Sequence, residues 1–315
     1  MSGAEQTAGR VAGPEAARLL RLATTASVAT ACVLIVVKLA AYVMTGSVAI
    51  LATLIDSLLD AAASVLNFIA VRHALVPADR EHRFGHGKAE PLAALGQAAF
   101  ITGSAIFLTI EAVPRFFSPR PLEQGEIGIA VMVFSIVATV ALVALQRHVI
   151  RRTGSLAISA DQLHYVGDVL VNGAVILALV LVAQFGWQFI DPLFGIGIAA
   201  YILYNAWQIA RGALDMLMDR ELPDEERSRI RDVISSHDGV LGIHDLRTRA
   251  SGPQIFIQCH IELDAAQSLQ RAHAIADAVE DDLMKAFPGA EVIIHQDPYP
   301  APDAGPQRFG GADRP

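Results

Sequence analysis

Two carboxylates stand inside a long apolar stretch. Asp56 and Asp60 lie within residues 47–71, a run that otherwise carries no charge. Their four-residue spacing places both side chains on one face of a helix. A carboxylate at the centre of a bilayer costs about 2.5–3.5 kcal/mol on insertion scales, so the pair needs a compensating partner.

A second pair with the same spacing can supply that partner. His164 and Asp168 stand in a later apolar run, and Asn172 continues their stripe. Two helices that each present such a pair can surround one ion, and carboxylate oxygen and imidazole nitrogen are both good zinc ligands. We therefore predict one intramembrane metal site from the two pairs: Asp56, Asp60, His164 and Asp168.

The ordinary interpretation is that the two aspartates snorkel to the membrane surface or pair with a basic residue. Lys38 in the first apolar segment is a candidate partner, although it lies near the helix end and can itself snorkel. One pair with this spacing is weak evidence for a metal site. Two such pairs in separate apolar segments are strong evidence.

The ligand types of this site also predict proton coupling. Metal binding requires a neutral His164 and ionised carboxylates, so metal and protons compete for the same atoms. Histidine titrates near neutrality, where small changes switch its charge. If the site opens alternately to the two sides of the membrane, this competition couples metal export to proton import.

The loop after residue 73 carries a second set of ligand types. Asp79, His82 and His86 follow one another at spacings of three and four residues. A lone His-x3-His pattern is weakly specific, so the ordinary alternative here is a solvated loop. The same holds for a third set near the carboxyl end, which considered alone fits ordinary surface histidines: His244, His260, His273, His295 and Asp297.

The elements that position these residues follow from hydropathy. The chain has 315 residues, of which 53% are hydrophobic and 18% charged, below the roughly 25% charged that is usual for soluble domains. Six apolar segments are each near the roughly 20 residues that a bilayer helix requires, at about 23–45, 47–73, 91–114, 125–148, 157–185 and 190–211. The net charge of −8, with no basic stripe, argues against a nucleic-acid partner.

Basic residues predict the orientation of these spans. They gather before the first segment, between the second and third, and between the fourth and fifth, whereas the other side has only Arg115 and Arg120. The positive-inside rule therefore places both termini in the cytoplasm of a multi-pass protein of the cell (inner or plasma) membrane.

A small soluble α+β domain is predicted to follow. A helix at about 224–236, strands at 239–248 and 254–263, a helix at 268–287 and a strand at 291–294 give the order αββαβ, which is ferredoxin- or metallochaperone-like. In the second strand, residues 255 to 263 alternate between an apolar and a polar face. The predicted parts are a disordered tail (1–14), a six-helix transmembrane domain (15–213), a cytoplasmic metal-binding dimerisation domain (214–298) and a second disordered tail (299–315).

Three short motifs make a family resemblance specific. The stretches 84–90 (FGHGKAE), 244–249 (HDLRTR) and 294–298 (IHQDP), together with the two four-residue spacings, resemble the cation diffusion facilitator family, and within it the bacterial zinc/iron exporters of the YiiP type. The resemblance covers nearly the whole chain except its two tails.

The resemblance implies roles for individual residues. It places a transport site on Asp56, Asp60, His164 and Asp168, a loop site on Asp79, His82 and His86, and a cytoplasmic site on His244, His260, His273, His295 and Asp297. It implies a structural charge pair between Lys88 and, less directly, Asp219. It also implies a homodimer joined through the αββαβ domains, with a rocking alternating-access cycle.

The sequence thus predicts a proton-coupled exporter of divalent metal rather than an enzyme. A histidine in the transport site favours Zn²⁺, with Cd²⁺ and Fe²⁺ as alternatives, over Mg²⁺ or Ca²⁺, which prefer all-oxygen shells. Zn²⁺ is also the expected structural ion of the cytoplasmic site. The alternative function is a metal-sensing scaffold that binds but does not transport. An intramembrane metallohydrolase is disfavoured because the chain has no His-Glu-x-x-His motif.

Overall fold

The structure is a computed structural model that describes residues 13–117, 126–185 and 190–299. The chain divides into two compact units. One is Ala16–Leu214, and the other comprises Met1–Glu15 and Asp215–Pro315. Each unit is described by itself.

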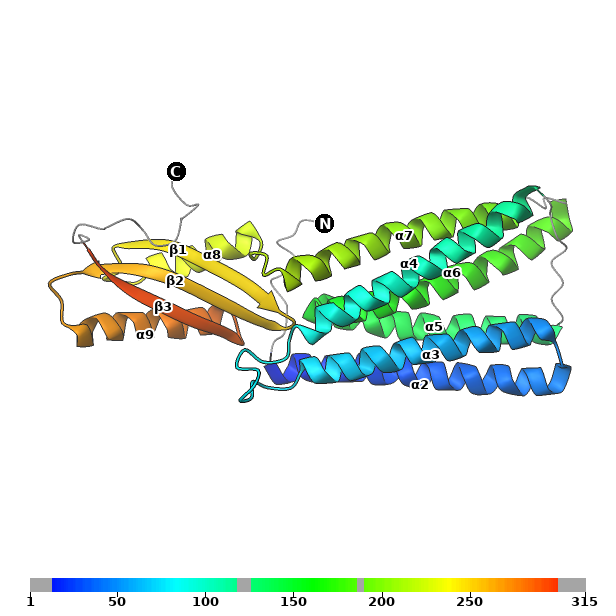
Figure 1. Ribbon diagram of the computed structural model, residues 1–315, viewed down its shortest axis with the longest axis horizontal. Coiled ribbons are helices and arrows are strands. Elements are labelled where there is room, and N and C mark those ends of the chain that lie inside the picture. The colour runs from blue at the N-terminus through cyan, green and yellow to red at the C-terminus, as the bar shows by residue number, and fades with distance from the viewer. Residues whose placement is uncertain (1–12, 118–125, 186–189, 300–315) are drawn as a thin grey trace. The chain divides into compact units, whose positions relative to one another are not determined.

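The first unit is built from long helices, as predicted (Figure 1). They are α2 (Gly13–Thr45), α3 (Val48–Ala74), α4 (Ala89–Phe117), α5 (Glu126–Thr153), α6 (Leu156–Phe185) and α7 (Ile190–Leu217). Over their described residues, α2, α3, α4, α5 and α7 each contain a segment that is long and apolar enough to cross a membrane. The remaining helix, α6, has 30 residues and packs against α3, α4 and α5.

A tight turn at Gly46 joins the first two helices. Gly46 adopts a φ of 61°, and its N–H donates to the carbonyl of Tyr42 at 2.7 Å. A residue with positive φ directly after a helix ends that helix and turns the chain, and glycine does this without a steric penalty.

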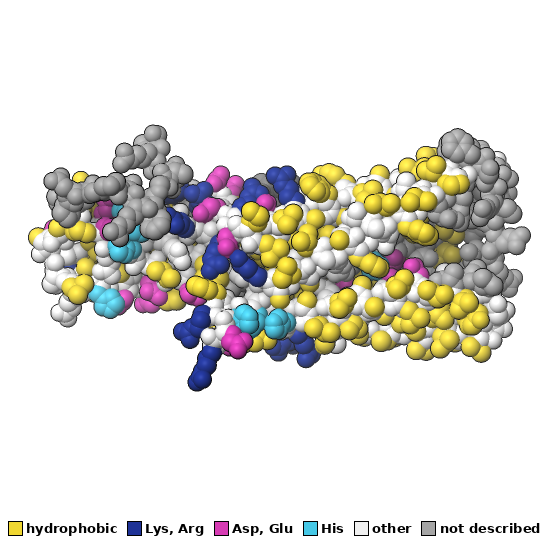
Figure 2. All heavy atoms as spheres, viewed as in Figure 1, with side chains coloured by type: hydrophobic (Ala, Val, Ile, Leu, Met, Phe, Trp, Pro, Cys, Tyr) yellow, Lys and Arg dark blue, Asp and Glu magenta, His cyan; other side chains and the backbone are white. Residues whose placement is uncertain are grey.

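Small side chains let the helices approach one another, while large apolar ones face outward. One buried cluster joins α4, α6 and α7 through Ala94, Ala160 and Ala213. Large apolar residues such as Val36, Leu66 and Phe107 are exposed, and Figure 2 shows apolar side chains over much of the visible face of this unit. An apolar exterior of this extent is expected of a surface that contacts lipid.

The second unit has the predicted order αββαβ. It consists of α8 (Asp224–Ser235), β1 (Gly242–Ser251), β2 (Gln254–Asp264), α9 (Leu269–Ala286) and β3 (Ala290–Tyr299). The strands form a sheet in the order β1-β2-β3, with β1 antiparallel and β3 parallel to β2. The last strand is longer than predicted and includes Pro298, which an edge strand tolerates. Tyr299, where a tail is predicted to begin, therefore belongs to β3, and residues 300–315 lie outside the described part.

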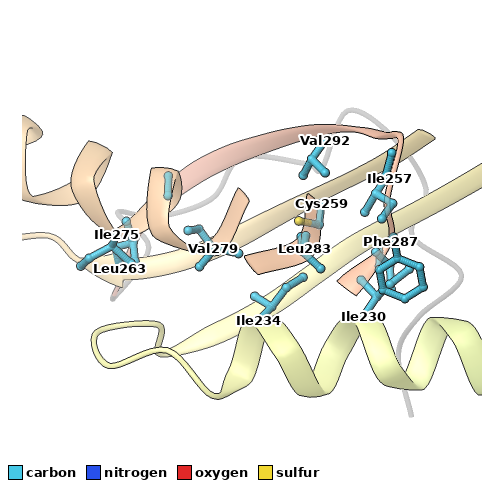
Figure 3. Packing of buried hydrophobic residues seen from close by; sticks show 14 residues of the cluster. Ile230, Ile234, Ile257, Cys259, Leu263, Ile275, Val279, Leu283, Phe287 and Val292 are labelled. Atoms are coloured by element: carbon cyan, nitrogen blue, oxygen red, sulfur yellow. The ribbon is translucent and has the colours of Figure 1, made fainter. Parts of the chain in front are cut away.

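One face of this sheet holds the hydrophobic core. Ile257 and Cys259 of β2 are buried with Ile234 of α8 and Val279 and Leu283 of α9, as Figure 3 shows. The alternation predicted for residues 255–263 is therefore confirmed on the core face. The polar face of β2 differs from this prediction at one position. Phe256 is 2% exposed, and the guanidinium of Arg249 lies 4.2 Å from its ring centroid.

Candidate metal-binding sites

Helices α3 and α6 bring three of the predicted transport-site residues together. His164 Nε2 lies 2.9 Å from Asp60 Oδ1 and 3.9 Å from Asp168 Oδ2. One ligand atom from each of these three residues falls within 4.8 Å of the others. His164 and Asp168 are one helical turn apart, and α3 contacts α6, so the contact between the helices adds Asp60 to the pair.

The nitrogen of His164 has the properties of a metal ligand. Its side chain is 9% exposed, and Nε2 has no hydrogen-bond partner among the described residues although Asp60 Oδ1 is 2.9 Å away. The two atoms are close but are not aligned for a hydrogen bond. Two atoms that share a tetrahedral zinc ion stand roughly 3.3–3.4 Å apart, between the two separations found here. These donors fit a divalent transition metal.

Asp56, the fourth predicted ligand, lies one turn earlier on α3 and its side chain is exposed. It is within electrostatic reach of Asp60, Lys38 and His164 but is not one of the three grouped residues. Lys38 Nζ donates to Ser57 Oγ at 2.6 Å and to the Thr53 carbonyl at 3.2 Å. The role of Asp56 as a ligand stays a prediction.

A buried polar hub beside this site was missed by sequence reasoning. Asp161, one turn before His164 on α6, is fully buried and accepts hydrogen bonds from three other helices. The donors are Ser27 of α2, Gln97 of α4 at 3.1 Å and Gln146 of α5 at 2.7 Å. The hub therefore joins the ligand-bearing helix to three of its neighbours. The sequence signal that could have indicated this hub is a glutamine or an acid inside each of three apolar segments, namely Gln97, Gln146 and Asp161.

The predicted loop site also comes together between α3 and α4. Asp79 lies 3.5 Å from His82 Nδ1 and 3.4 Å from His86 Nε2. Gly85 has a φ of 74°, and its N–H donates to the His82 carbonyl at 3.0 Å, so the chain turns sharply just before His86. The backbone N–H of His82, which donates to Asp79 at 2.6 Å, holds the pKa of that carboxyl below its ordinary value. An ionised carboxylate is the form that binds metal.

The cytoplasmic cluster is built by the sheet register. His244 of β1 stands opposite His260 of β2, which in turn stands opposite His295 of β3. A bulge follows His244, where Asp245 adopts a φ of 49°. Bulges are over-represented next to functional sites because they re-aim side chains.

Asp297 is the carboxylate that these three histidines share. It lies 3.1 Å from His244 Nε2, 2.8 Å from His260 Nδ1 and 3.2 Å from His295 Nε2. Partial burial works to raise the pKa of Asp297, but the His260 hydrogen bond and the charges of the histidines outweigh it, so the pKa is lowered.

Two further residues qualify the prediction for this cluster. Glu262, which was not predicted, lies 3.3 Å from His244 Nδ1, a buried nitrogen without a hydrogen-bond partner in the described part of the chain. His273 is predicted as a ligand but is 68% exposed on α9, where it pairs with Asp277 at 3.3 Å. Because α9 packs on the core face, His273 does not join the other histidines within one chain. Its role stays a prediction.

The predicted charge pair would join residues of the two units, Lys88 of the helical unit and Asp219 of the other, and it stays a prediction. Within its own unit, Asp219 lies 3.3 Å from Arg249 Nη1.

The fold and its sites define a class of protein. Long apolar helices that enclose metal-ligand side chains make this a multi-pass membrane protein, and a small αββαβ unit carries a further histidine cluster. Residues 24–218 match the family model of the cation efflux transmembrane domain, and residues 222–299 match that of the cation efflux protein, cytoplasmic domain. The chain therefore belongs to the cation efflux, or cation diffusion facilitator, family, as its motifs predict.

Individual relatives are similar in sequence to this chain along most of their length. The cation-efflux pump FieF of Serratia proteamaculans (strain 568) is 51% identical over 90% of this chain and 95% of the relative. Pumps of the same name from Escherichia fergusonii and Escherichia coli (strain K12 / DH10B) are each 50% identical over 89% of this chain and 93% of theirs. A solved structure of CzrB is 37% identical over 24% of this chain and 96% of that one, but its TM-score of 0.24 establishes no likeness of fold. This is a family of transporters, not of enzymes.

Proposed function

We propose that this protein exports a divalent transition metal ion from the cytoplasm in exchange for protons, with Zn²⁺ as the leading substrate and Cd²⁺ and Fe²⁺ as alternatives. The observation that carries the proposal is the convergence of Asp60, His164 and Asp168 within the helical unit. Relatives that are about half identical over most of the chain bear the name of cation-efflux pumps, which supports the direction of transport.

The donor types support a borderline metal ion as substrate. Mg²⁺ and Ca²⁺ prefer shells made only of oxygen, whereas an imidazole nitrogen suits Zn²⁺ and its neighbours. In this proposal Asp56 is the fourth ligand, supplied from the turn of α3 next to Asp60. Rotation about the side-chain bonds of Asp56 would bring its carboxylate toward the other ligands without any movement of α3.

Proton coupling follows from competition at these atoms. The metal needs His164 neutral and all three carboxylates ionised, whereas protons occupy the same groups when the metal leaves. A site that opens to the cytoplasm binds metal and releases protons. When it opens to the other side, protons displace the metal. The topology that this cycle uses has both termini in the cytoplasm, in accordance with the distribution of basic residues.

The cytoplasmic unit is proposed to bind structural Zn²⁺ and to join two copies of the chain. Three histidines and one shared carboxylate form a donor set typical of zinc. The family model that matches residues 222–299 bears the name of a dimer domain, which supports a homodimer. His244, His260, His295 and Asp297 would hold the ion.

A metal-sensing scaffold is the second candidate, and the cytoplasmic cluster is the observation that favours it. A sensor that binds metal through the cytoplasmic cluster does not need the separate cluster between α3 and α6, so that cluster favours transport. Transport assays on purified protein in proteoliposomes distinguish the two functions.

The decisive comparison is zinc uptake by the native protein, by Asp60→Ala and by Asn205→Ala. Asn205 is a matched control because it hydrogen-bonds to its own helix, at the Tyr201 carbonyl. We expect uptake by native protein and by Asn205→Ala, and none above empty liposomes by Asp60→Ala. Undiminished uptake by Asp60→Ala refutes the site, and no uptake by native protein favours the scaffold.

A further inference from the structure

The loop between α3 and α4 holds three side chains spaced as the ligands of one ion. Asp79 Oδ2 lies 3.4 Å from His86 Nε2, and Asp79 Oδ1 lies 3.5 Å from His82 Nδ1. Two atoms bound to a tetrahedral zinc ion at about 2.0–2.1 Å stand roughly 3.3–3.4 Å apart. The spacing fits, but structural zinc sites are almost always four-coordinate. A fourth ligand is therefore expected nearby.

His86 is the best-fixed ligand of the three. Its side chain is 6% exposed, and its Nδ1 lies 3.3 Å from the carbonyl oxygen of Val76. A carbonyl oxygen only accepts, so Nδ1 carries the proton, and in the neutral imidazole Nε2, which faces Asp79, keeps its lone pair. Metal-bound histidines are usually oriented by such a hydrogen bond from the nitrogen that does not bind the metal.

A further imidazole stands against His86. His73 lies in the last turn of α3, and its ring centroid is 4.7 Å from that of His86, with the ring planes at 66°. The ring of His82 is 4.5 Å from the same His86 ring. The segment 73–76 turns tightly here, because the N–H of Val76 donates to the His73 carbonyl at 3.0 Å. The carbonyl that orients His86 thus belongs to the same turn that carries His73.

The side chain of His73 is exposed and can change rotamer at little cost. His73 is not among the three residues whose ligand atoms already fall within 4.8 Å of one another. Because its ring stands against that of His86, rotation about its side-chain bonds, without movement of α3, would bring a nitrogen toward the other ligands. The exposed rings of His73 and His82 would enclose the ion from solvent, with His86 beneath them.

We propose that His73 is the fourth ligand of the loop site, which then binds one divalent transition metal ion through three imidazoles and the carboxylate of Asp79. The inference rests on the loop site and not on transport. This donor set suits Zn²⁺ and disfavours Mg²⁺ and Ca²⁺. Its consequence is mechanical, because metal at this site ties the loop to the end of α3, the helix that carries Asp60.

The test uses the full-length protein with the other two sites removed by Asp60→Ala, His260→Ala and Asp297→Ala. Zn²⁺ affinity is measured by competition with a chromophoric chelator, and the visible absorption of bound Co²⁺ reports changes in coordination. His73→Ala is compared with His148→Ala, which removes another exposed histidine from a helix of the same unit, α5. Asp79→Ala in the same background shows how much binding belongs to the loop.

We expect His73→Ala to weaken Zn²⁺ binding by at least about tenfold, since loss of even a ligand-orienting partner costs about 10–100-fold in affinity. The Co²⁺ spectrum should change as well, and His148→Ala should alter neither readout. Unchanged affinity and spectrum in His73→Ala, with binding lost in Asp79→Ala, would overturn His73 as a ligand. Binding that survives Asp79→Ala would overturn the loop site itself. Neither result bears on zinc transport by the native protein, which is measured separately.

Discussion

His164 Nε2 and Asp60 Oδ1 lie 2.9 Å apart across the contact between α6 and α3, but they are not aligned for a hydrogen bond. A buried imidazole nitrogen that makes no hydrogen bond costs about 1–3 kcal/mol. A metal ion placed between the two atoms would satisfy both. Selectivity and affinity of the proposed transport site should therefore depend on the nitrogen of His164.

Replacement of His164 by aspartate tests that dependence. His164→Asp exchanges nitrogen for oxygen, so the site becomes harder, and we expect the preference for Zn²⁺ over Mn²⁺ to fall by about tenfold. Competition between the two ions for uptake into proteoliposomes measures the preference. An unchanged Zn²⁺/Mn²⁺ ratio in a variant that still transports would count against His164 as a ligand.

Loss of the Asp161 hub should destabilise the helical unit. Asp161→Ala leaves the buried donors of Ser27, Gln97 and Gln146 without their acceptor, which we expect to cost roughly 2–4 kcal/mol. Thermal unfolding in detergent measures the effect. Ser104→Ala, an exposed change on α4, serves as the control. An unfolding midpoint of Asp161→Ala equal to that of the control would show that the hub does not hold the helices.

Zinc should stabilise the cytoplasmic unit through its histidine cluster. At about 100 times its Kd, a bound ligand adds about 2.7 kcal/mol to stability. We expect Zn²⁺ to raise the unfolding midpoint of this unit in native protein and in His237→Ala but not in His260→Ala. His237 is a suitable control because it pairs with Asp282, outside the cluster. A full zinc-induced shift in His260→Ala would contradict the assignment.

Cys259 should be chemically inert while the sheet is folded. Burial raises the pKa of its thiol to about 11, above its ordinary value. Because the folded-state pKa is the higher one, the stabilising contribution of the neutral thiol is complete below the unfolded pKa and is lost as pH rises through about 11. In Cys32→Ala protein at pH about 8, we expect an alkylating reagent to modify Cys259 only after unfolding. Rapid modification of folded protein would show that the β2 core opens.

Features that depend on periodicity could be predicted from the sequence. The apolar runs predicted the helices, and the alternation along β2 predicted Ile257 and Cys259 in the core. Phe256 broke the pattern because it is buried on the polar face of the sheet, where the guanidinium of Arg249 lies over its ring. The register of the three strands, which places His244, His260 and His295 in one row, required the structure.

The candidate sites were predicted where ligand types recur at helical spacing. The Asp161 hub was not, because its four members come from four helices, and no spacing along the chain indicates which faces meet. Glu262 was missed for a similar reason. The pairing of β1 with β2 brings Glu262 close to His244, although the two residues are far apart in the sequence.

The measurement that tests the central claim most directly is zinc flux into proteoliposomes under an imposed pH gradient. With an acidic interior, protons that leave should drive zinc in. We predict faster zinc entry than without a gradient, an accompanying rise of the internal pH, and loss of the acceleration when a protonophore is added. Zinc entry that ignores the gradient and moves no protons would contradict the account.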